Sequence, residues 1–187
     1  MNGAAVFLAE GFEEIEALTV VDICRRCGIV IDMVSVTKER QVTGSHGVTV
    51  TADKVFSQID FDKYAMLILP GGMPGTKNLE AHAELMEQID NFYENGKYIA
   101  AVCAAPSIFG HKGILKGRNA CSYPDFESHL EGALVTQEPV EISDHVITSR
   151  GMGTAIDFGL AIAGVLGTRE KADEIAGAII YNRRGAK

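Results

Sequence analysis

Short apolar segments alternate with amphipathic segments along most of the chain. Apolar runs typical of buried strands cover residues 4–8, 29–36, 66–69, 99–102 and 146–149. Apolar positions recur at helical spacing over residues 13–27, 79–93, 154–166 and 169–180. Between them, residues 42–50 alternate around two glycines, which predicts a β-excursion with a turn.

This order of elements predicts one fold class. Strands that are apolar throughout belong in a parallel sheet covered on both faces, so we expect a three-layer α/β sandwich with a mostly parallel sheet. No repeat, linker or change of composition divides residues 1–187, and we therefore treat them as a single domain. In such sheets ligands bind at the carboxyl edge of the strands, so the turns after the strands are candidates for chemistry.

Composition and charge argue against several classes of function. Since 17 Lys and Arg stand against 25 Asp and Glu, the net charge is −8, and a nucleic acid is not expected as the main partner. No apolar run is long enough to cross a bilayer, and the first residues, Met1–Ala4, lack the features of a signal peptide. Four cysteines are too few for a disulfide framework in this chain. We expect a cytoplasmic protein with reduced thiols and no membrane association.

Cys103 is the first candidate for chemistry. It follows the strand expected at residues 99–102, where a helix begins, and Ala101, Ala104 and Ala105 leave room for a sharp turn. Such a turn would present the thiol to the crevice, and the following helix N-terminus would favour the thiolate. The alternative is that Cys103 is a small buried hydrophobe, because unpaired cysteines are often buried.

Three acids follow the first strand, at the same edge of the sheet as Cys103. Glu13, Glu14 and Glu16 lie in the first turn of the first helix, where acids stabilise the helix dipole, and this explains one or two of them. Glu13 and Glu16 share a face, whereas Glu14 is turned away from it. One acid can therefore point over the crevice while another stays in solvent, and periodicity does not decide which.

The segment Pro70-Gly71-Gly72 follows the strand at residues 66–69. It can be a tight turn and nothing more. Beside a nucleophile, adjacent glycines also allow backbone N–H groups to approach a substrate oxygen, as an oxyanion hole requires. No Gly-Lys-Ser/Thr follows, so phosphoryl transfer is not expected.

Two further motifs are assigned to structure. Cys24 and Cys27 match C-x-x-C but lie near a helix C-terminus, whose dipole opposes thiolate formation, so we expect core packing and not a redox dithiol or zinc site. His129 and Glu131 resemble part of an amidotransferase triad, but residues two apart on a helix do not face each other, so we expect His129 on the surface. The other histidines, His46 among them, carry no motif. We expect no metal and no cofactor.

These turns, in this order, resemble the ThiJ/PfpI (DJ-one) superfamily, and most of all its DJ-one and ThiJ branch. The resemblance implies a flavodoxin-like fold, a homodimer, Cys103 as the reactive residue and Glu16 as its acid partner. Oxyanion or substrate contacts are then expected from Gly71, Gly72 and Ala104, with Tyr123 and Arg150 as neighbours. The matching segments, between residue 4 and about residue 180, are Gly11-Phe12-Glu13-Glu14-Ile15-Glu16, Leu69-Pro70-Gly71-Gly72, Ala101-Val102-Cys103-Ala104-Ala105-Pro106 and Thr148-Ser149-Arg150-Gly151.

Two departures bear on the reaction. Amidase- and protease-like members of the superfamily place a histidine directly after the nucleophile, where this chain has Ala104. A thiol protease without an adjacent base is handicapped at protonating the leaving amine, so peptide hydrolysis is disfavoured. Tyr123 stands where some members have a histidine. Its phenol can donate a hydrogen bond but is a poor base at neutral pH.

The leading hypothesis, supplied by the resemblance, is a cofactor-independent glyoxalase or deglycase that acts on methylglyoxal, glyoxal or their protein adducts. Cys103 would add to the aldehyde, and backbone N–H groups of Gly72 and Ala104 would hold the oxyanion. Glu16 would then move a proton between the two carbons. The alternative is a redox-sensing stress protein or chaperone regulated by oxidation of Cys103. Both functions need the same site.

The expected homodimer should be isologous and built around the first helix and residues 11–16. Arg26 is a candidate for charge pairing with the acidic turn of the second protomer. Sedimentation equilibrium at micromolar concentration should give twice the mass of the chain, and a monomer would contradict this expectation.

Overall fold

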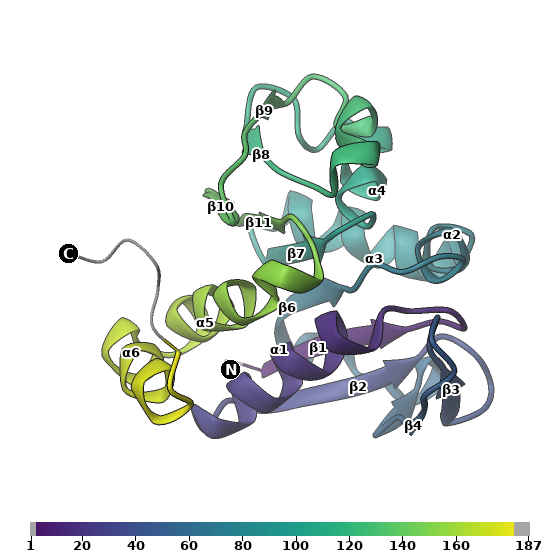
Figure 1. The fold of residues 1–187 in the computed structure, drawn as a ribbon. Helices are drawn as coiled ribbons and strands as arrows, with labels where there is room; N and C mark the ends of the chain where they lie inside the picture. The colour runs from purple at the N-terminus through teal and green to yellow at the C-terminus, as the bar shows by residue number, and fades with distance from the viewer. Residues whose placement is uncertain (1–2, 182–187) are drawn as a thin grey trace.

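A seven-stranded sheet forms the middle layer of the protein (Figure 1). The computed structural model describes residues 3–181. Residues 182–187 lie outside the described residues, as do Met1 and Asn2, on which the expected absence of a signal peptide rests in part. The strands of this sheet are β1 (Gly3–Leu8), β2 (Ile31–Ser35), β5 (Lys54–Val55), β6 (Tyr64–Leu69), β7 (Tyr98–Val102), β10 (Val140–Ser143) and β11 (Val146–Ser149). Their order is β10-β11-β7-β6-β1-β2-β5, and all neighbours are parallel except β10 and β11. Two small sheets pair β3 (Gln41–Thr43) with β4 (Thr49–Thr51) and β8 (Asn119–Ala120) with β9 (Leu134–Val135).

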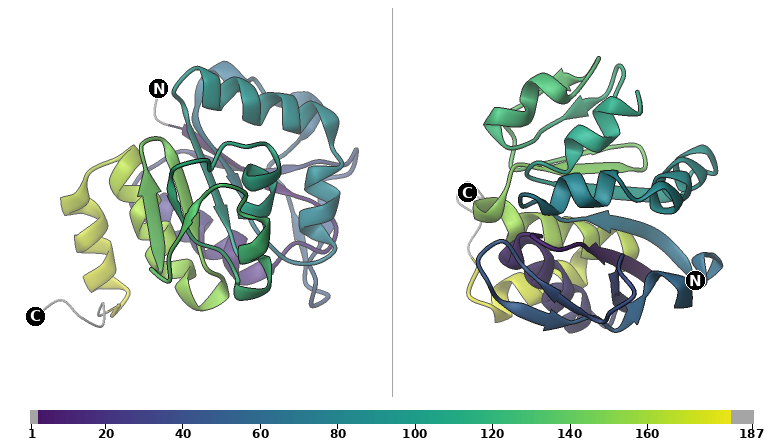
Figure 2. Two further views of the ribbon diagram at one scale, coloured as in Figure 1. Left: turned by 90° about the horizontal axis from the view of Figure 1, so that it is seen from above. Right: turned by 90° about the vertical axis from the view of Figure 1, so that its right-hand side faces the viewer.

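Helices cover both faces of the sheet (Figure 2). They are α1 (Glu14–Arg26), α2 (Gly75–Glu80), α3 (Ala83–Glu94), α4 (Pro106–His111), α5 (Ala155–Leu166) and α6 (Arg169–Ala178). Because side chains alternate along a strand, Ala4, Val6 and Leu8 of β1 pack with α1, α5 and α6, whereas Ala5 and Phe7 pack with α2, α3 and α4. The expected mostly parallel three-layer α/β sandwich is thereby confirmed. Within residues 3–181, no helix combines the length and apolarity that a membrane crossing needs.

Two helices differ from their predicted extents. The single helix expected over residues 79–93 is divided into α2 and α3, with the break at Ala81 and His82. The ring of His82 accepts a hydrogen bond from the N–H of Leu85 at 3.2 Å, so it satisfies one of the donors left free at the start of α3. At the other end of the chain α6 stops at Ala178, and Ile180 adopts the left-handed region with φ 60°.

The predicted β-excursion is the β3–β4 hairpin, which lies outside the main sheet (Figure 1). Backbone hydrogen bonds attach it to the turn after β1. The N–H of Gly11 donates to the carbonyl of Thr43, and the N–H of Ser45 donates to the carbonyl of Phe12, both at 2.8 Å. The tip of the hairpin therefore lies beside the N-terminus of α1, at the carboxyl edge of the sheet.

Candidate active site

Cys103 directly follows β7 and occupies a strained turn. Its φ is 64°, in the left-handed region that residues other than glycine rarely adopt. Backbone hydrogen bonds hold the turn on both sides: the N–H of Cys103 donates to Ser149 at 3.0 Å, and its carbonyl accepts from the N–H of Tyr123 at 2.9 Å. The side chain is half-buried. The structure thus contains the sharp strand–turn–helix that the small neighbouring residues predict.

The thiol faces a cavity of about 370 Å³ at the carboxyl edge of the sheet. A second hollow, of about 320 Å³ between α5, α6 and β10, has no cysteine, serine or histidine among its described lining residues. The cavity beside the thiol is bordered by four segments, namely the turns after β1, β6 and β7 and the tip of the β3–β4 hairpin. The residues that line it are Glu13, Ser45, His46, Gly72, Met73, Cys103, Ala104, Tyr123 and Phe126.

Glu16 of α1 is the acid that interacts with Cys103. Its side chain is buried, and Oε2 accepts a hydrogen bond from the N–H of Gly71 at 2.9 Å. The other oxygen, Oε1, is buried without a well-formed hydrogen bond to any described residue. A buried carboxylate oxygen without a donor is unfavourable, whereas a protonated one can itself donate. Burial accordingly raises the pKa of Glu16 to about 7, against opposing contributions from Cys103 and the Gly71 N–H.

The charges of Cys103 and Glu16 are coupled. Burial and the negative charge of Glu16 raise the pKa of Cys103 to about 12, although the N–H groups of Ala104 and Gly72 act in the opposite direction. The expected thiolate is therefore not the favoured form: the N–H of Ala104, at the turn into the helix, does lower the pKa, but burial and repulsion by Glu16 outweigh it. When Glu16 carries the proton, the repulsion is absent and the two N–H groups are left to stabilise the sulfur anion.

The two glycines after β6 permit this close packing. A Cβ on Gly71 would lie 2.6 Å from Cβ of Cys103 and 2.7 Å from Oε2 of Glu16. Gly72 has φ 89°, and a Cβ there would lie 2.4 Å from the backbone nitrogen of Glu13. Of the three expected oxyanion donors, Gly72 and Ala104 have N–H groups that lower the pKa of the Cys103 thiol, so they act on the sulfur. The N–H of Gly71 is instead bound to Glu16, so Gly71 positions the acid.

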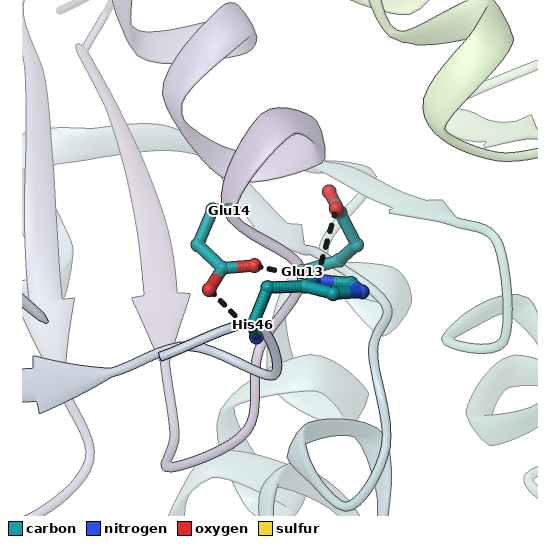
Figure 3. A group of neighbouring side chains, drawn as sticks. All are labelled: Glu13, Glu14 and His46. Atoms are coloured by element: carbon teal, nitrogen blue, oxygen red, sulfur yellow. Dashed lines mark hydrogen bonds and ion pairs between the residues drawn. The ribbon is translucent and has the colours of Figure 1, made fainter. Parts of the chain in front are cut away.

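Glu13 and Glu14 are also buried, which corrects the expectation that one of the three acids stays in solvent. Glu13 caps α1, since its Oε2 accepts from the N–H of Glu16 at 2.8 Å. Glu14 binds the hairpin: Oε1 accepts from the N–H of His46 at 2.8 Å, and Oε2 lies 3.1 Å from Nδ1 of the same residue (Figure 3). Burial opposes ionisation of Glu14, but backbone N–H groups and the His46 ring together hold its pKa below the ordinary value.

His46 is the cavity residue that the sequence did not reveal. It comes from the hairpin tip, far from Cys103 along the chain, and no motif surrounds it. With Glu13 and Glu14 it brings one possible metal ligand each to within 4.8 Å of one another. Hydrogen bonds among these side chains and with backbone N–H groups already account for their arrangement, so we describe them as a hydrogen-bonded cluster.

The two expected neighbours lie differently. Tyr123 lines the cavity, and its side chain is exposed. Arg150 does not line it: the guanidinium lies 3.8 Å from a carboxylate oxygen of Glu127, and Nε is buried without a hydrogen bond to a described residue. Gly151 is closer to the thiol, since a Cβ there would come within 3.9 Å of Sγ of Cys103.

The remaining thiols are less suited to react. Cys24 and Cys121 are buried, and burial raises their pKa values to about 12 and about 11. Cys27 follows α1, is half-buried against the core, and also has a pKa raised by burial. The packing interpretation of Cys24 and Cys27 therefore agrees with the structure. His129 is exposed, as expected, and its Nδ1 lies 3.1 Å from Nε2 of His111.

The family match, the relatives and the solved structure described here all point to one protein family. The family model described as "DJ-1/PfpI family" matches residues 2–164. Protein DJ-1 homolog B of Arabidopsis thaliana is 34% identical over 175 residues, 92% of this chain but 40% of that protein, so the chain spans about two fifths of this relative. The Caenorhabditis elegans protein named "Glutathione-independent glyoxalase DJR-1.2" is 30% identical over 167 residues, 89% of either chain. The structure titled "Toxoplasma gondii DJ-1, oxidized" superposes with a TM-score of 0.91 at 34% identity, over 96% of this chain and 98% of that one.

Alkylation should distinguish the four cysteines. With iodoacetamide at neutral pH, Cys103 should be labelled first, because it is accessible and its proton can move to Glu16. Cys24 and Cys121 should be labelled much more slowly because they are buried, and Cys27 should also be slow because it packs against the core and burial raises its pKa. Peptide mass spectrometry over a time course measures the order. Rapid formation of a Cys24–Cys27 disulfide under mild oxidation would contradict the packing assignment.

The raised pKa of Glu16 predicts a pH-dependent stability. Between its ordinary value of 4.5 and about 7, the folded state holds a proton that the unfolded state has released. The contribution of Glu16 is therefore fully present below about pH 4.5 and is lost as the pH rises to about 7, by up to about 3 kcal/mol. Urea denaturation across this range should show the decline, and Glu16→Gln should remove most of it. An unchanged slope in Glu16→Gln would contradict the assignment.

Proposed function

Because the chain belongs to the DJ-1/PfpI family, we propose that it is a cysteine-dependent, cofactor-independent glyoxalase or deglycase. Its substrates would be small α-oxoaldehydes such as methylglyoxal and glyoxal, or their protein adducts. One observation carries the proposal: a thiol in a strained turn lies beside a buried carboxyl group whose pKa is near 7. The relative named as a glutathione-independent glyoxalase supports the same chemistry.

The first step is addition of the thiol to the aldehyde. The Cys103 proton passes to Glu16 as the sulfur attacks the aldehyde carbon and a C–S bond forms. Negative charge develops on the aldehyde oxygen, where the N–H groups of Gly72 and Ala104 are available to stabilise it. That oxygen then takes the proton held by Glu16, which gives a neutral hemithioacetal and a carboxylate.

The second step moves a hydrogen between the two carbons. The Glu16 carboxylate removes the proton from the carbon bonded to sulfur, and an enediolate forms with its charge on the neighbouring oxygen. The same carboxyl group returns that proton to the neighbouring carbon, and the hydroxyl proton on the first carbon passes to the neighbouring oxygen, which produces the thioester of a 2-hydroxy acid. A pKa near 7 suits this role, because a group that accepts and donates in turn works best near the operating pH. Hydrolysis then releases lactate from methylglyoxal, with no net oxidation or reduction.

The direct test is turnover of methylglyoxal. The native protein should convert methylglyoxal and water into lactate in steady state without glutathione, and Cys103→Ser should abolish this. Lactate measured with a stereospecific dehydrogenase gives the rate. A native protein that forms no lactate would overturn the proposed activity.

Glu16→Gln separates nucleophilicity from proton transfer. Glutamine retains a hydrogen-bond donor to the sulfur but cannot exchange a proton, so turnover should fall by at least about 10²-fold while alkylation of Cys103 persists. Glu16→Leu should impair both, since the donor is lost. Glu39→Gln, at an exposed position outside the cavity, is the matched control. Near-native turnover by Glu16→Gln would show that Glu16 is not the proton shuttle.

A second candidate function is a redox-sensing stress protein or chaperone, favoured by the contrast between accessible Cys103 and the buried Cys24 and Cys121. Peroxide would oxidise the Cys103 thiolate to the sulfenic and then the sulfinic acid, the peroxide being reduced to water. Stoichiometric oxidation of Cys103 that changes the binding of unfolded clients, in the absence of lactate formation, would favour this role over catalysis.

Assembly is part of the proposal. We expect a homodimer around α1, which would help to shape the cavity near the acidic turn. Arg26 already forms an exposed ion pair with Asp22 of its own helix, at 2.6 Å. Pairing of Arg26 across an interface would therefore have to replace or share an existing contact.

A further inference from the structure

The reaction proposed above ends with a step that still lacks a base. Water must attack the thioester of Cys103, and Glu16 is already bound to Gly71 beside the sulfur. Neither position at which a histidine is found in related proteins can supply the base, because Ala104 has no side-chain proton acceptor and Tyr123 is a phenol. The cavity wall contains an imidazole, that of His46, while the carboxylate of Glu13 in the same wall is held by the N–H of Glu16 as the cap of α1.

The surroundings of His46 determine how its ring is used. Three oxygens lie near Nδ1: Oε2 of Glu14 at 3.1 Å, Oγ of Ser45 at 3.1 Å and Oε1 of Glu13 at 3.8 Å. Since Glu14 is ionised and can only accept, the hydrogen of the neutral ring belongs on Nδ1. Nε2 is then left with a free lone pair, and it points away from both glutamates (Figure 3).

Glu14 is itself held rigidly. Its side chain is buried, and Oε1 accepts N–H bonds from His46 at 2.8 Å and from Val48 at 3.3 Å. Gly44 makes room for it, since a Cβ there would lie 2.3 Å from the carboxylate carbon of Glu14. A buried carboxylate that fixes the tautomer and direction of an imidazole is the arrangement that general bases use in hydrolases.

His46 and Cys103, the two residues that this hydrolysis would use, line the same cavity. The His46 side chain is 74% exposed in the single chain, and its ring borders the cavity. Cys103 lines the same cavity from the end of β7. His46 and an acyl group carried by the sulfur of Cys103 would thus border the same space, from which the attacking water has to come.

We propose that His46, positioned by Glu14, is the general base that activates water for hydrolysis of the acylated Cys103. This inference rests on the proposed glyoxalase function. Nε2 takes a proton from water as the water oxygen bonds to the thioester carbonyl carbon. The C–S bond then breaks, Cys103 leaves as the thiolate, and the hydroxy acid is released. The imidazolium returns its proton to solvent, so the step consumes one water and no redox partner.

The test follows the acyl-enzyme. Native protein, His46→Gln and His129→Gln are mixed with methylglyoxal, and lactate and the intact protein mass are measured over time. His129 is exposed and lies outside the cavity, so it is the matched control. His46→Gln should lower kcat by about 10²-fold and accumulate close to one lactoyl thioester per chain. Release as a hydroxamate by hydroxylamine distinguishes the thioester from the isomeric hemithioacetal.

Two further variants make the test specific. Imidazole added to His46→Ala should restore turnover severalfold, because the exposed site leaves room for a free base. Glu14→Gln should also accumulate the thioester. An amide N–H facing Nδ1 favours the tautomer with its hydrogen on Nε2, which leaves no lone pair there to accept a proton from water. Alkylation of Cys103 should stay unchanged. A role of Glu14 in stability alone would lower the unfolding midpoint without trapping the thioester.

The outcomes separate the two proposals. Absence of lactate with the native protein would overturn the glyoxalase function and this inference with it. Lactate formation that is unaffected in His46→Gln would overturn the inference and leave the function standing. Loss of turnover in His46→Gln without a trapped thioester would place its role before hydrolysis, and would also overturn the inference.

Discussion

The proton shared between Glu16 and Cys103 is the interaction on which the site depends. Burial makes a charge on either group unfavourable, and two charges side by side are more unfavourable still. Glu16 and Cys103 together therefore hold at least one proton. The reactive form is the singly protonated one in which the carboxyl of Glu16 holds the proton and Cys103 is a thiolate. Much of the surrounding backbone serves this arrangement. Cys103 is in a strained conformation, Gly71 leaves room for both side chains, and the N–H of Gly72 lowers the pKa of the thiol.

The start of α1 organises the rest of the site. Its three glutamates lie within one helical turn, yet each has a different partner. Glu13 caps the helix, Glu14 binds the β3–β4 hairpin, and Glu16 reaches the thiol. Their environments also shift their pKa values in opposite directions: the pKa of Glu14 is lowered, whereas that of Glu16 is raised to about 7. A separation of this kind between neighbouring acids is what assigns different chemical tasks to residues of the same type.

The β3–β4 hairpin brings His46 into the cavity wall of this chain. The chain has the fold of the DJ-1/PfpI family, and the resemblance of its turns to that family implies a reactive thiol with an acid partner. Ala104 and Tyr123 line the cavity without offering an imidazole, and the imidazole in the cavity wall comes from the hairpin. The cavity is bordered by several separate loops, so its proton-accepting groups come from parts of the chain that can vary independently of the fold.

Periodicity and small neighbouring residues predicted the five inner strands of the main sheet, the helices on its two faces and the turn that carries Cys103, because each depends on residues within a few positions. They did not predict β5, β8 and β9, which have two residues each, or β10, in which apolar and polar residues alternate, or the break between α2 and α3, which depends on a capping histidine. They also did not show which of Glu13, Glu14 and Glu16 meets the thiol; the family resemblance pointed to Glu16, and the structure places it there. Only the tertiary structure decided the charges of these acids and the place of His46. The physical reason is that a pKa depends on burial and on neighbours distant in sequence, and that the hairpin is held on α1 by backbone hydrogen bonds that side-chain patterns do not record.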